Sequence, residues 1–316
     1  MATLITGGSG HIGAELARQL VARGEEVVIF DIALHEFRLA DILGKVKTVR
    51  GDVGNFSQVL ETVKANRIDQ IYHLGAMLTG NTEQNPWPSM QSNVSGTFHI
   101  LEAARLFEIK KVLFISSIGS YGATEPPEVI TDVTLQRPIT LYGAQKLFGE
   151  GLGRWYKTTF GLDFRCLRYP QMLAPNVRTP RHWSPPMIED TILGRPHQSD
   201  TGSQGRVIMM YLDDCARSAR MIMDAPRENI RTLAYNITGI QQSVWSPELK
   251  AILEARYPKA DIRLNENDKS AHPPNQSFDD SAARAEWGWK PEYDSIDRIL
   301  DKFEADMRDH PKRFGL

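Results

Sequence analysis

A tyrosine and a lysine stand four residues apart in the run Tyr142-Gly143-Ala144-Gln145-Lys146. If this run begins a helix, the spacing puts the phenol and the ammonium on one face. A tyrosine has an unperturbed pKa of about 10, too high for a base at neutral pH, and a neighbouring cation lowers that pKa by stabilising the phenolate. The pair predicts a general acid/base, and the competing interpretation is an exposed helical Tyr–Lys pair.

Two adjacent hydroxyl groups, those of Ser116 and Ser117, end the apolar run that precedes this helix. If the run is a strand of a parallel sheet, these hydroxyls lie at its carboxyl end, where sheets of this kind bind ligands. A serine there can hold a substrate oxygen beside the phenol. This second feature favours a catalytic site over an exposed pair.

A glycine-rich run, Thr6-Gly7-Gly8-Ser9-Gly10-His11-Ile12-Gly13, follows the first predicted strand and opens the first predicted helix. We expect Gly7 to make the tight turn, Gly10 to let backbone approach a pyrophosphate, and Gly13 to let the helix lie close to the sheet. The helix N-terminus, with His11 and Ile12, would then offer free N–H groups and its positive dipole end to the phosphates.

Acidic and small residues follow the next three predicted strands. Asp31 ends the second strand, close to the spacing of about 20 residues at which a carboxylate hydrogen-bonds an adenosine ribose 2′-hydroxyl. A carboxylate there repels a 2′-phosphate, so the sequence favours NAD over NADP; the alternative is that Asp31 caps a turn. Asp52 and Val53, and then Leu74-Gly75-Ala76, are expected at the same edge, where an aspartate can reach adenine and small residues let a cofactor pass.

Short β-branched runs alternate with helical stretches through the first half of the chain. Crossovers of this length need parallel strands with helices on both faces. We therefore predict an α/β fold, a doubly wound parallel (Rossmann) sheet with a smaller C-terminal α/β substrate lobe. The expected strands are 3–6, 26–30, 46–50, 70–74, 112–116 and 163–169, and the expected helices are 12–23, 56–65, 93–107 and 141–160.

The regular alternation of strands and helices ends near Pro170. Prolines beyond this point break the chain into loops and one short predicted helix, 186–193. We expect residues 1–175 to form the NAD-binding domain, with 206–239 rejoining it as strand, helix and strand. Residues 176–205 and 240–316 are expected to form the substrate-binding lobe, with a short strand at 261–264.

Composition limits the classes of partner. The 316 residues are 41% apolar with a net charge of −2, which suits one two-lobed unit and a small-molecule substrate, and argues against nucleic acid. Cys166 and Cys215 stand in apolar settings, as core thiols of a reducing compartment do. With no basic leader and no apolar run of membrane-spanning length, we expect a cytoplasmic protein that does not enter a membrane. The scattered histidines show no metal-ligand spacing, so no metal is expected.

Together the motifs resemble the extended short-chain dehydrogenase/reductase superfamily, that of the NAD-dependent epimerases and dehydratases, over essentially the whole chain. The resemblance implies that Tyr142 is the general acid/base and that Lys146 binds the nicotinamide ribose and lowers the pKa of Tyr142. It implies that Ser117 orients the substrate oxygen, with Ser116 as the alternative. Asn93, which opens a predicted helix, and Tyr169 match family positions beside the cofactor. The residues that carry the resemblance are Gly7, Gly10, Gly13, Asp31, Ser117, Tyr121-Gly122, Tyr142 and Lys146.

Runs in both halves are also similar to the short-chain type of L-threonine 3-dehydrogenase. The chain departs from that branch at Gln171, where glycine is usual after Arg-Tyr-Pro, and at 175–183, where a Gly-Thr-Thr-Asp-like run is usual; threonine itself is therefore not implied. In that second segment Arg178 and Arg181 could clamp a carboxylate or phosphate, because guanidinium groups bind such anions bidentately, or could belong to a solvated loop. Thr79 and Gln171 are further substrate-pocket candidates. The runs similar to the branch are His73-Leu74-Gly75-Ala76, Asn85-Pro86, Met209-Met210-Tyr211-Leu212-Asp213-Asp214, Tyr235-Asn236 and Trp287-Gly288-Trp289.

The sequence thus predicts an NAD-dependent oxidoreductase that oxidises a secondary alcohol of a small polar, anionic substrate such as a hydroxy acid or sugar acid. One alternative is a sugar-nucleotide epimerase or dehydratase that recycles its cofactor, with Arg206 or Arg178 on the diphosphate. Another is a regulator that senses the cofactor through an inactive site. A purely structural protein would leave Gly10 and Asp31 without a purpose. The resemblance further implies a homodimer that pairs helices 93–107 and 141–160.

Overall fold

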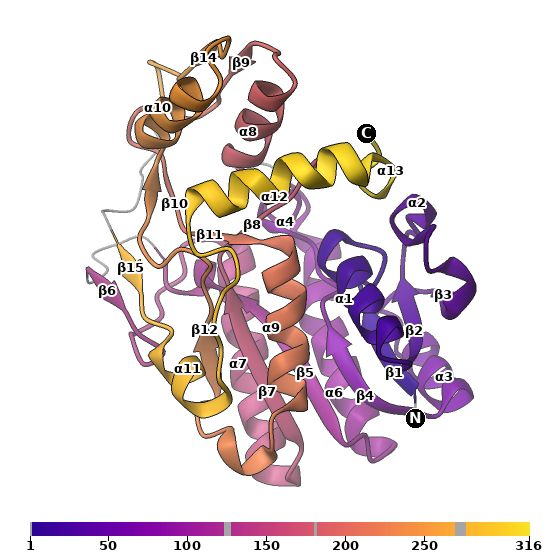
Figure 1. The fold of residues 1–316 in the computed structure, drawn as a ribbon. Coiled ribbons are helices and arrows are strands. Elements are labelled where there is room, and N and C mark those ends of the chain that lie inside the picture. The colour runs from indigo at the N-terminus through magenta and orange to yellow at the C-terminus, as the bar shows by residue number, and fades with distance from the viewer. Residues whose placement is uncertain (1, 123–127, 180–181, 269–275) are drawn as a thin grey trace.

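A seven-stranded parallel sheet forms the centre of the computed structural model, which describes residues 2–122, 128–179, 182–268 and 276–316 (Figure 1). The strand order is β12-β7-β5-β4-β1-β2-β3, and each neighbouring pair is parallel. The predicted doubly wound α/β fold is therefore confirmed. The strands are β1 Ala2–Thr6, β2 Glu26–Asp31, β3 Val46–Arg50, β4 Ile68–His73, β5 Lys111–Ser117, β7 Asp163–Tyr169 and β12 Ala234–Asn236.

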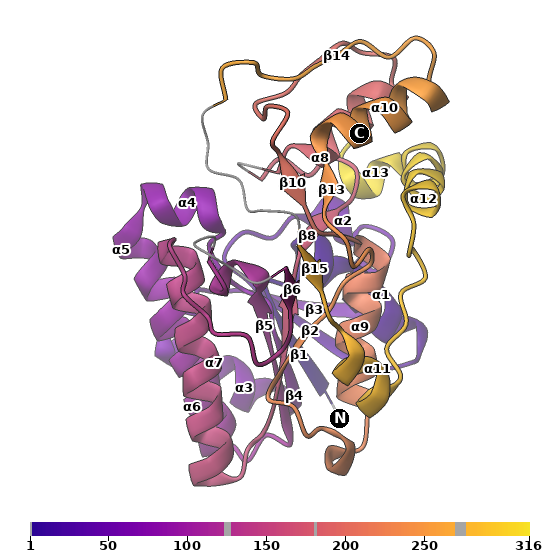
Figure 2. The ribbon, with the colours of Figure 1, turned by 90° about the vertical axis from the view of Figure 1, so that its left-hand side faces the viewer.

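Helices cover both faces of this sheet, as Figure 2 shows edge-on. One face carries α1 (His11–Ala22), α9 (Leu212–Asp224) and α11 (Ser281–Trp287), and α1 packs beside α9. The other face carries α3 (Phe56–Asn66), α6 (Gly96–Leu106) and α7 (Leu141–Phe160). The interior strands β1, β4, β5 and β7 are thus buried for most of their length on both faces, which explains their largely apolar sequences, whereas the edge strand β3 stays partly exposed.

Helix α7 approaches the sheet closely because two of its glycines face aromatic rings. A Cβ at Gly149 would lie 2.5 Å from Phe114 Cζ on β5, and a Cβ at Gly153 would lie 2.1 Å from Phe164 Cζ on β7. These rings occupy the space that larger helical residues would need. The start of α7 is therefore held against the carboxyl end of β5.

A second, smaller group of elements lies beyond the carboxyl ends of the central strands, at the top of Figure 1. Its core joins residues of α8, β10, β13, α10 and α12. The elements of this group are α8 Ser184–Ile192, β9 His197–Gln198, β10 Arg206–Val207, β13 Val244–Trp245, α10 Ser246–Arg256, β14 Ile262–Arg263, α12 Ile296–Asp309 and α13 Pro311–Phe314.

The segment 206–239 divides between the two groups. Helix α9 and strand β12 join the central layers, but the strand expected before them does not enter the central sheet. It splits into β10, which pairs with β13, and β11 (Met209–Tyr211), which pairs with β8 (Gln171–Leu173). A similar short pair joins β6 (Val129–Ile130) to β15 (Ser277–Phe278).

The helix expected over 93–107 begins differently. A π-helical turn over Met90–Ser95 precedes α6, so Asn93 lies in that turn rather than at a helix start. The remaining elements are short and lie in connections. They are α2 Glu36–Leu39, the 3₁₀ turns Leu43–Lys45, Ile118–Ser120 and Arg227–Asn229, α4 Thr79–Gln84 and α5 Pro86–Ser89. Within the described ranges, no helix is long and apolar enough to cross a membrane.

Candidate active site

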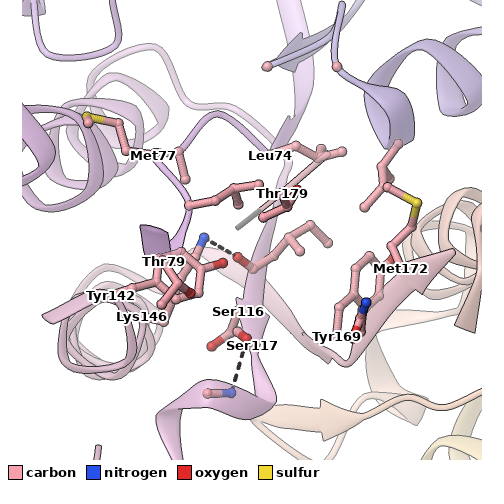
Figure 3. Close-up of a pocket in the computed structure, with 18 of the residues that line it drawn as sticks. Leu74, Met77, Thr79, Ser116, Ser117, Tyr142, Lys146, Tyr169, Met172 and Thr179 are labelled. Carbon is pink, nitrogen blue, oxygen red and sulfur yellow. Dashed lines mark hydrogen bonds between the residues drawn. The ribbon is translucent and has the colours of Figure 1, made fainter. Parts of the chain in front are cut away.

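A cavity of about 1070 Å³ crosses the carboxyl ends of the central strands, below the smaller group of elements. Its walls come from the loops after β1 to β5 and after β7, and from the start of α7. Most of the predicted site residues line this cavity, and Figure 3 draws some of them. Those that line the cavity are Gly7, Gly10, His11, Ile12, Gly13, Asp31, Asp52, Val53, Leu74, Gly75, Ala76, Thr79, Ser116, Ser117, Tyr142, Lys146, Tyr169 and Gln171.

The glycine-rich turn after β1 has no room for side chains at two positions. Gly7 has a φ of +66°, and a Cβ there would lie 2.8 Å from the backbone of Gly75. A Cβ at Gly13 would lie 2.4 Å from the carbonyl oxygen of Gly7. Helix α1 begins directly after Gly10, whose position carries no capping side chain, so its first N–H groups are available to an anion.

The two predicted adenosine-side carboxylates also order the turns around them. Asp31 Oδ2 accepts hydrogen bonds from Ser9 N (3.0 Å) and Ser9 Oγ (2.8 Å), which ties the end of β2 to the glycine-rich turn. Asp52 Oδ1 accepts from Gly54 N at 2.8 Å. His11, at the first position of α1, is uncharged at neutral pH because burial lowers its pKa to about 3. Asp31, Asp52 and His11 thus leave the cavity open beside the N-terminus of α1, where phosphates would bind. This arrangement fits an adenine dinucleotide.

The catalytic candidates meet where β5 ends and α7 begins. Thr140 caps α7 by accepting a hydrogen bond from Gly143 N (3.0 Å), and a Cβ at Gly143 would lie 2.4 Å from the carbonyl oxygen of Gly119. This close approach holds Tyr142 beside Ser117, as Figure 3 shows. Lys146, one turn further on, donates from Nζ to the carbonyl oxygen of Ile115 at 2.7 Å.

Burial shifts the pKa values of Tyr142 and Lys146 in directions that the sequence did not predict. Burial raises the pKa of Tyr142 to about 12, against the opposing effect of a hydrogen bond with Ser117. Burial also lowers the pKa of the Lys146 ammonium to about 8. Desolvation is thus the largest effect on Tyr142, and the lowering of its pKa expected from Lys146 is not seen in this arrangement.

A buried histidine network supports the loop after β4. His73 Nδ1 lies 2.7 Å from Thr6 Oγ1, which accepts from Gly75 N (3.1 Å), so Thr6 donates to His73. His73 Nε2 lies 3.1 Å from Thr97 Oγ1, which already donates to the carbonyl oxygen of Asn93 (2.7 Å). Because burial lowers its pKa to about 3, His73 is neutral and carries its proton on Nε2. The network joins β1, β4 and α6 behind the cofactor side of the cavity.

Two predicted site residues lie outside the cavity wall, and a third is not among the described residues. Asn93 does not line the cavity; its amide accepts from Met77 N (2.7 Å) and donates to the carbonyl oxygen of Met77 (2.9 Å), so it positions the loop after β4. Arg178 also does not line the cavity and forms an ion pair with the buried Glu189. Arg181 lies outside the described residues. In this structure Glu189 of α8 therefore holds the Arg178 guanidinium, and an anion clamp formed by the 175–183 segment stays a prediction.

Tyr169 and Gln171 line the cavity with part of their side chains committed elsewhere. The Tyr169 hydroxyl donates to the carbonyl oxygen of Cys215 on α9 at 2.6 Å, so its ring rather than its hydroxyl faces the site. Gln171 Nε2 donates to Ser184 Oγ at 3.2 Å. Figure 3 shows Tyr169 and Met172 across the cavity from Tyr142 and Lys146.

Some residues that line the cavity come from segments far apart in the sequence, and no sequence motif predicted them. They include Thr179, Ser243, Gln276 and Phe278. Their chemistry is ordinary in sequence, and only the β8–β11 and β6–β15 pairings bring them to the cavity. Among the described residues, no group of three or more histidine, cysteine, aspartate or glutamate side chains could hold a metal ion.

Fold and site together define an NAD-dependent enzyme of the short-chain dehydrogenase type. The chain belongs to the NAD dependent epimerase/dehydratase family, whose model matches residues 3–238. It is 30% identical over 303 residues to the mitochondrial L-threonine 3-dehydrogenase of Bos taurus, a match that covers 92% of this chain and 79% of that protein.

Solved structures agree with this assignment. A GalE-like L-threonine dehydrogenase from Cupriavidus necator in its holo form superposes with a TM-score of 0.87 and 28% identity, covering 97% of this chain and all of that one. A UDP-glucose 4-epimerase from Thermotoga maritima shares the fold, with a TM-score of 0.83, 19% identity, and coverage of 98% and 99%. The threonine dehydrogenase-like branch predicted from sequence is supported, and the cofactor is NAD.

We predict that Asp31→Asn weakens the discrimination against NADP. Asparagine still accepts a hydrogen bond from Ser9 but no longer repels a 2′-phosphate, so the ratio of the NADPH and NADH dissociation constants should fall about tenfold. Titrating the fluorescence of each reduced cofactor measures that ratio. Asp52→Asn, a second cavity-lining carboxylate, is the matched control and should leave the ratio within about twofold of wild type. An unchanged ratio in Asp31→Asn would show that Asp31 acts only on the turn.

Proposed function

We propose that the protein oxidises a secondary alcohol of a small anionic hydroxy acid or sugar acid, with NAD as the hydride acceptor. In this proposal residues 1–175, with α9 and β12, bind the cofactor, and residues 176–205 and 240–316 cover the substrate. The single observation that carries the substrate class is the placement of Arg206 on the wall of the cavity that also holds Tyr142 and Ser117.

The guanidinium of Arg206 stacks on an aromatic ring of the neighbouring strand. Arg206 lies on β10, and its guanidinium carbon lies 3.8 Å from the centre of the Trp245 ring on the paired strand β13. This stacking orients the plane of the guanidinium, and a planar guanidinium suits bidentate binding of a carboxylate. Arg206 therefore takes the part that the sequence had assigned to Arg178 and Arg181.

The charges of the cavity favour a hydroxy acid over an amino acid. Among the described residues that line it, the carboxylates are Asp31 and Asp52, which follow β2 and β3 on the adenosine side. An ammonium beside Ser117 and Tyr142 would find no counter-ion in that set. His182, also on the wall, is neutral because burial lowers its pKa to about 4. Thr79, Thr179 and Gln276 also line the cavity and offer hydroxyl and amide groups to the substrate's polar atoms.

The proposed chemistry uses the trio at the end of β5 and the start of α7. Ser117 Oγ holds the substrate hydroxyl beside Tyr142, and the Tyr142 phenolate takes the proton from that hydroxyl as the carbonyl forms. NAD supplies the acceptor for the hydride that leaves the carbon. Lys146, as an ammonium, holds the nicotinamide ribose. Burial keeps Tyr142 protonated in this structure, so the proposed reaction requires that Tyr142 lose its proton in the complex, where the ammonium favours the phenolate. The residues contribute orientation and charge, since the cofactor carries the redox chemistry.

We predict steady NADH formation when the protein and NAD meet a panel of hydroxy acids and sugar acids. Tyr142→Phe should lower kcat by about 10²- to 10⁴-fold, because it removes the proton acceptor, while NADH binding persists. Absorbance of NADH gives the rate, and fluorescence titration gives the binding. Tyr156→Phe, on the same helix with its hydroxyl donating to Glu102, is the control and should keep the wild-type rate. Full activity in Tyr142→Phe would refute the assigned base.

We predict that Arg206→Met raises KM for the acid substrate. Loss of a charge-assisted hydrogen bond costs about 1.5–3 kcal/mol, so kcat/KM should fall about 10- to 100-fold. Initial-rate kinetics with the acid and with its uncharged ester separate the effect, because the ester should lose little. Arg178→Met is the matched control and should leave KM near the wild-type value. A larger loss of kcat/KM in Arg178→Met than in Arg206→Met would show that the 175–183 segment, rather than Arg206, binds the carboxylate.

A sugar-nucleotide epimerase or dehydratase is the second candidate, and Arg206 on the cavity wall supports it as well. Arg206 would then bind a diphosphate, because guanidinium groups bind phosphates bidentately. In that reaction the cofactor is reduced and reoxidised within one turnover, so no NADH accumulates. This function would be supported if no NADH formed with any hydroxy acid or sugar acid, and if mass spectrometry and NMR found an epimerised or dehydrated nucleotide sugar.

We propose a homodimer built on the outer surfaces of α6 and α7. Large apolar side chains are exposed on these neighbouring helices, among them Phe148 and Trp155, each 49% exposed. Exposed apolar groups that gather on adjacent elements mark interfaces more often than scattered ones do. A second copy of the same surface would bury them by twofold symmetry. The other members are Phe98, Leu106, Phe107 and Phe160.

We predict that Phe148→Asp combined with Trp155→Asp yields a folded monomer, because two carboxylates cannot be buried unpaired. Size-exclusion chromatography with light scattering measures the mass of each species. Leu193→Asp, at an equally exposed position (47%) after α8, is the control and should remain dimeric. A wild-type monomer, or a double variant that stays dimeric, would contradict the proposal.

A further inference from the structure

A buried carboxylate, Glu150, continues the catalytic face of α7 by one turn beyond Lys146. Positions 142, 146 and 150 are four residues apart and share one side of the helix. Glu150 is 3% exposed. The mechanism proposed above gives this residue no part, and a buried carboxylate needs compensation from its surroundings.

Four hydrogen bonds provide that compensation. Glu150 Oε1 accepts from Ser116 Oγ (2.6 Å) and from Arg168 Nε (2.9 Å). Glu150 Oε2 accepts from Arg168 Nη2 (2.7 Å) and from Gln136 Nε2 (3.2 Å). Ser116 and Arg168 are themselves register partners on β5 and β7, so the carboxylate joins α7 to the ends of two central strands.

Arg168 is saturated as well. Besides its two bonds to Glu150, it donates from Nη1 to Tyr121 Oη (2.6 Å) and to the carbonyl oxygen of Asp132 (2.8 Å), and from Nη2 to Gln136 Oε1 (3.2 Å). Its five N–H groups thus have five acceptors. Two of these contacts reach the segment that leads to α7, and Tyr121 lines the cavity. The pair is fixed from both sides.

We propose that Glu150 is a positioning residue for the catalytic trio: it is the anion that faces Lys146 and the anchor of Ser116, and Arg168 holds it in place. A buried ion pair contributes little to folding compared with apolar side chains of similar volume. Its location beside the trio gives it a functional role instead. This inference rests on the proposed role of Lys146 as the ammonium that holds the nicotinamide ribose.

The other groups around Lys146 carry no negative charge at neutral pH. From β5, Phe114 presents its ring at 4.9 Å and Ile115 its carbonyl oxygen. From β7, the thiol of Cys166 stays protonated because burial raises its pKa well above the usual range. From β4, His73 is neutral, and on α7 itself Tyr142 keeps its proton, because burial lowers the pKa of the first and raises that of the second.

Among the described residues, Glu150 is therefore the anion that opposes the desolvation of Lys146. Burial lowers the pKa of the Lys146 ammonium to about 8, opposed first by Cys166 and then by Glu150; of these two, Glu150 carries the charge, because the Cys166 thiol stays protonated. Removing that charge disfavours the ammonium further, so Lys146 would lose its proton at a lower pH. Binding that depends on the ammonium is present below this pKa and is lost as the pH rises through it.

The test measures NADH affinity by fluorescence from about pH 6 to about pH 10. In wild type the affinity should fall with a midpoint near the pKa of Lys146, about 8. Lys146→Met should abolish this pH-dependent limb. The paired variant Glu150→Gln with Arg168→Gln removes both buried charges together, which avoids an unpaired charge, and should move the midpoint down by about one pH unit.

The matched control is the Asp163–Arg165 ion pair, which is equally buried on β7 but at the far end of the strand. Asp163→Asn with Arg165→Gln should leave the midpoint at the wild-type value. A midpoint that is unmoved in the Glu150 and Arg168 variant, or moved equally in this control, would overturn the inference while leaving the proposed function standing. Absence of the limb in wild type would overturn the proposed role of Lys146 as well.

Glu150→Asp provides a second test that does not remove the charge. The shorter side chain withdraws the carboxylate from Lys146 and from Ser116 but keeps its balance with Arg168. The midpoint should move in the same direction by less than in the paired variant, and kcat/KM should fall several-fold. A wild-type midpoint with wild-type kcat/KM in Glu150→Asp would show that the position of the carboxylate does not matter, and would overturn the inference even if the paired variant did not fold.

Discussion

The site depends on the contact between α7 and the central sheet. Gly149 and Gly153 leave space for the rings of Phe114 and Phe164, and Gly143 passes close to the backbone at Gly119. These three close approaches fix the height of the helix over β5 and β7. Tyr142 and Lys146 are then placed by the backbone rather than by their own side chains, which is how a rigid scaffold holds catalytic groups at a constant separation.

Burial at that contact determines the chemistry of the ionisable groups. The same desolvation raises the pKa of Tyr142 and lowers that of Lys146, so both groups are driven toward their neutral forms. The proposed reaction needs the opposite, a phenolate beside an ammonium. In the inference drawn above, the carboxylate of Glu150, held by a bidentate arginine, is the fixed negative charge that favours the ammonium of Lys146.

The substrate side differs from the cofactor side in how it is built. The proposed cofactor side of the cavity is lined by consecutive β–α turns of one sheet, whereas the proposed substrate side includes residues from short strand pairs between segments far apart in the chain. Similarity to threonine dehydrogenases extends over the whole chain, yet the substrate wall carries Arg206 and a neutral His182 and departs from that branch at 175–183. Short loops and two-residue strands can change their side chains without disturbing the sheet, so specificity can diverge while the fold stays constant.

The sequence by itself determined the fold class and the cofactor, and it predicted an NAD site and a catalytic trio whose members line one cavity. Each depends on local rules: alternation of strands and helices, glycine where a turn has no room for Cβ, and i,i+4 spacing on a helix. Tertiary structure alone decided that Arg178 pairs with Glu189, that Asn93 positions a loop, and that Thr179 and Gln276 reach the cavity. It also decided the direction of the pKa shift at Tyr142. Those outcomes depend on burial and on contacts between distant segments, and neither is encoded in the spacing of neighbouring residues.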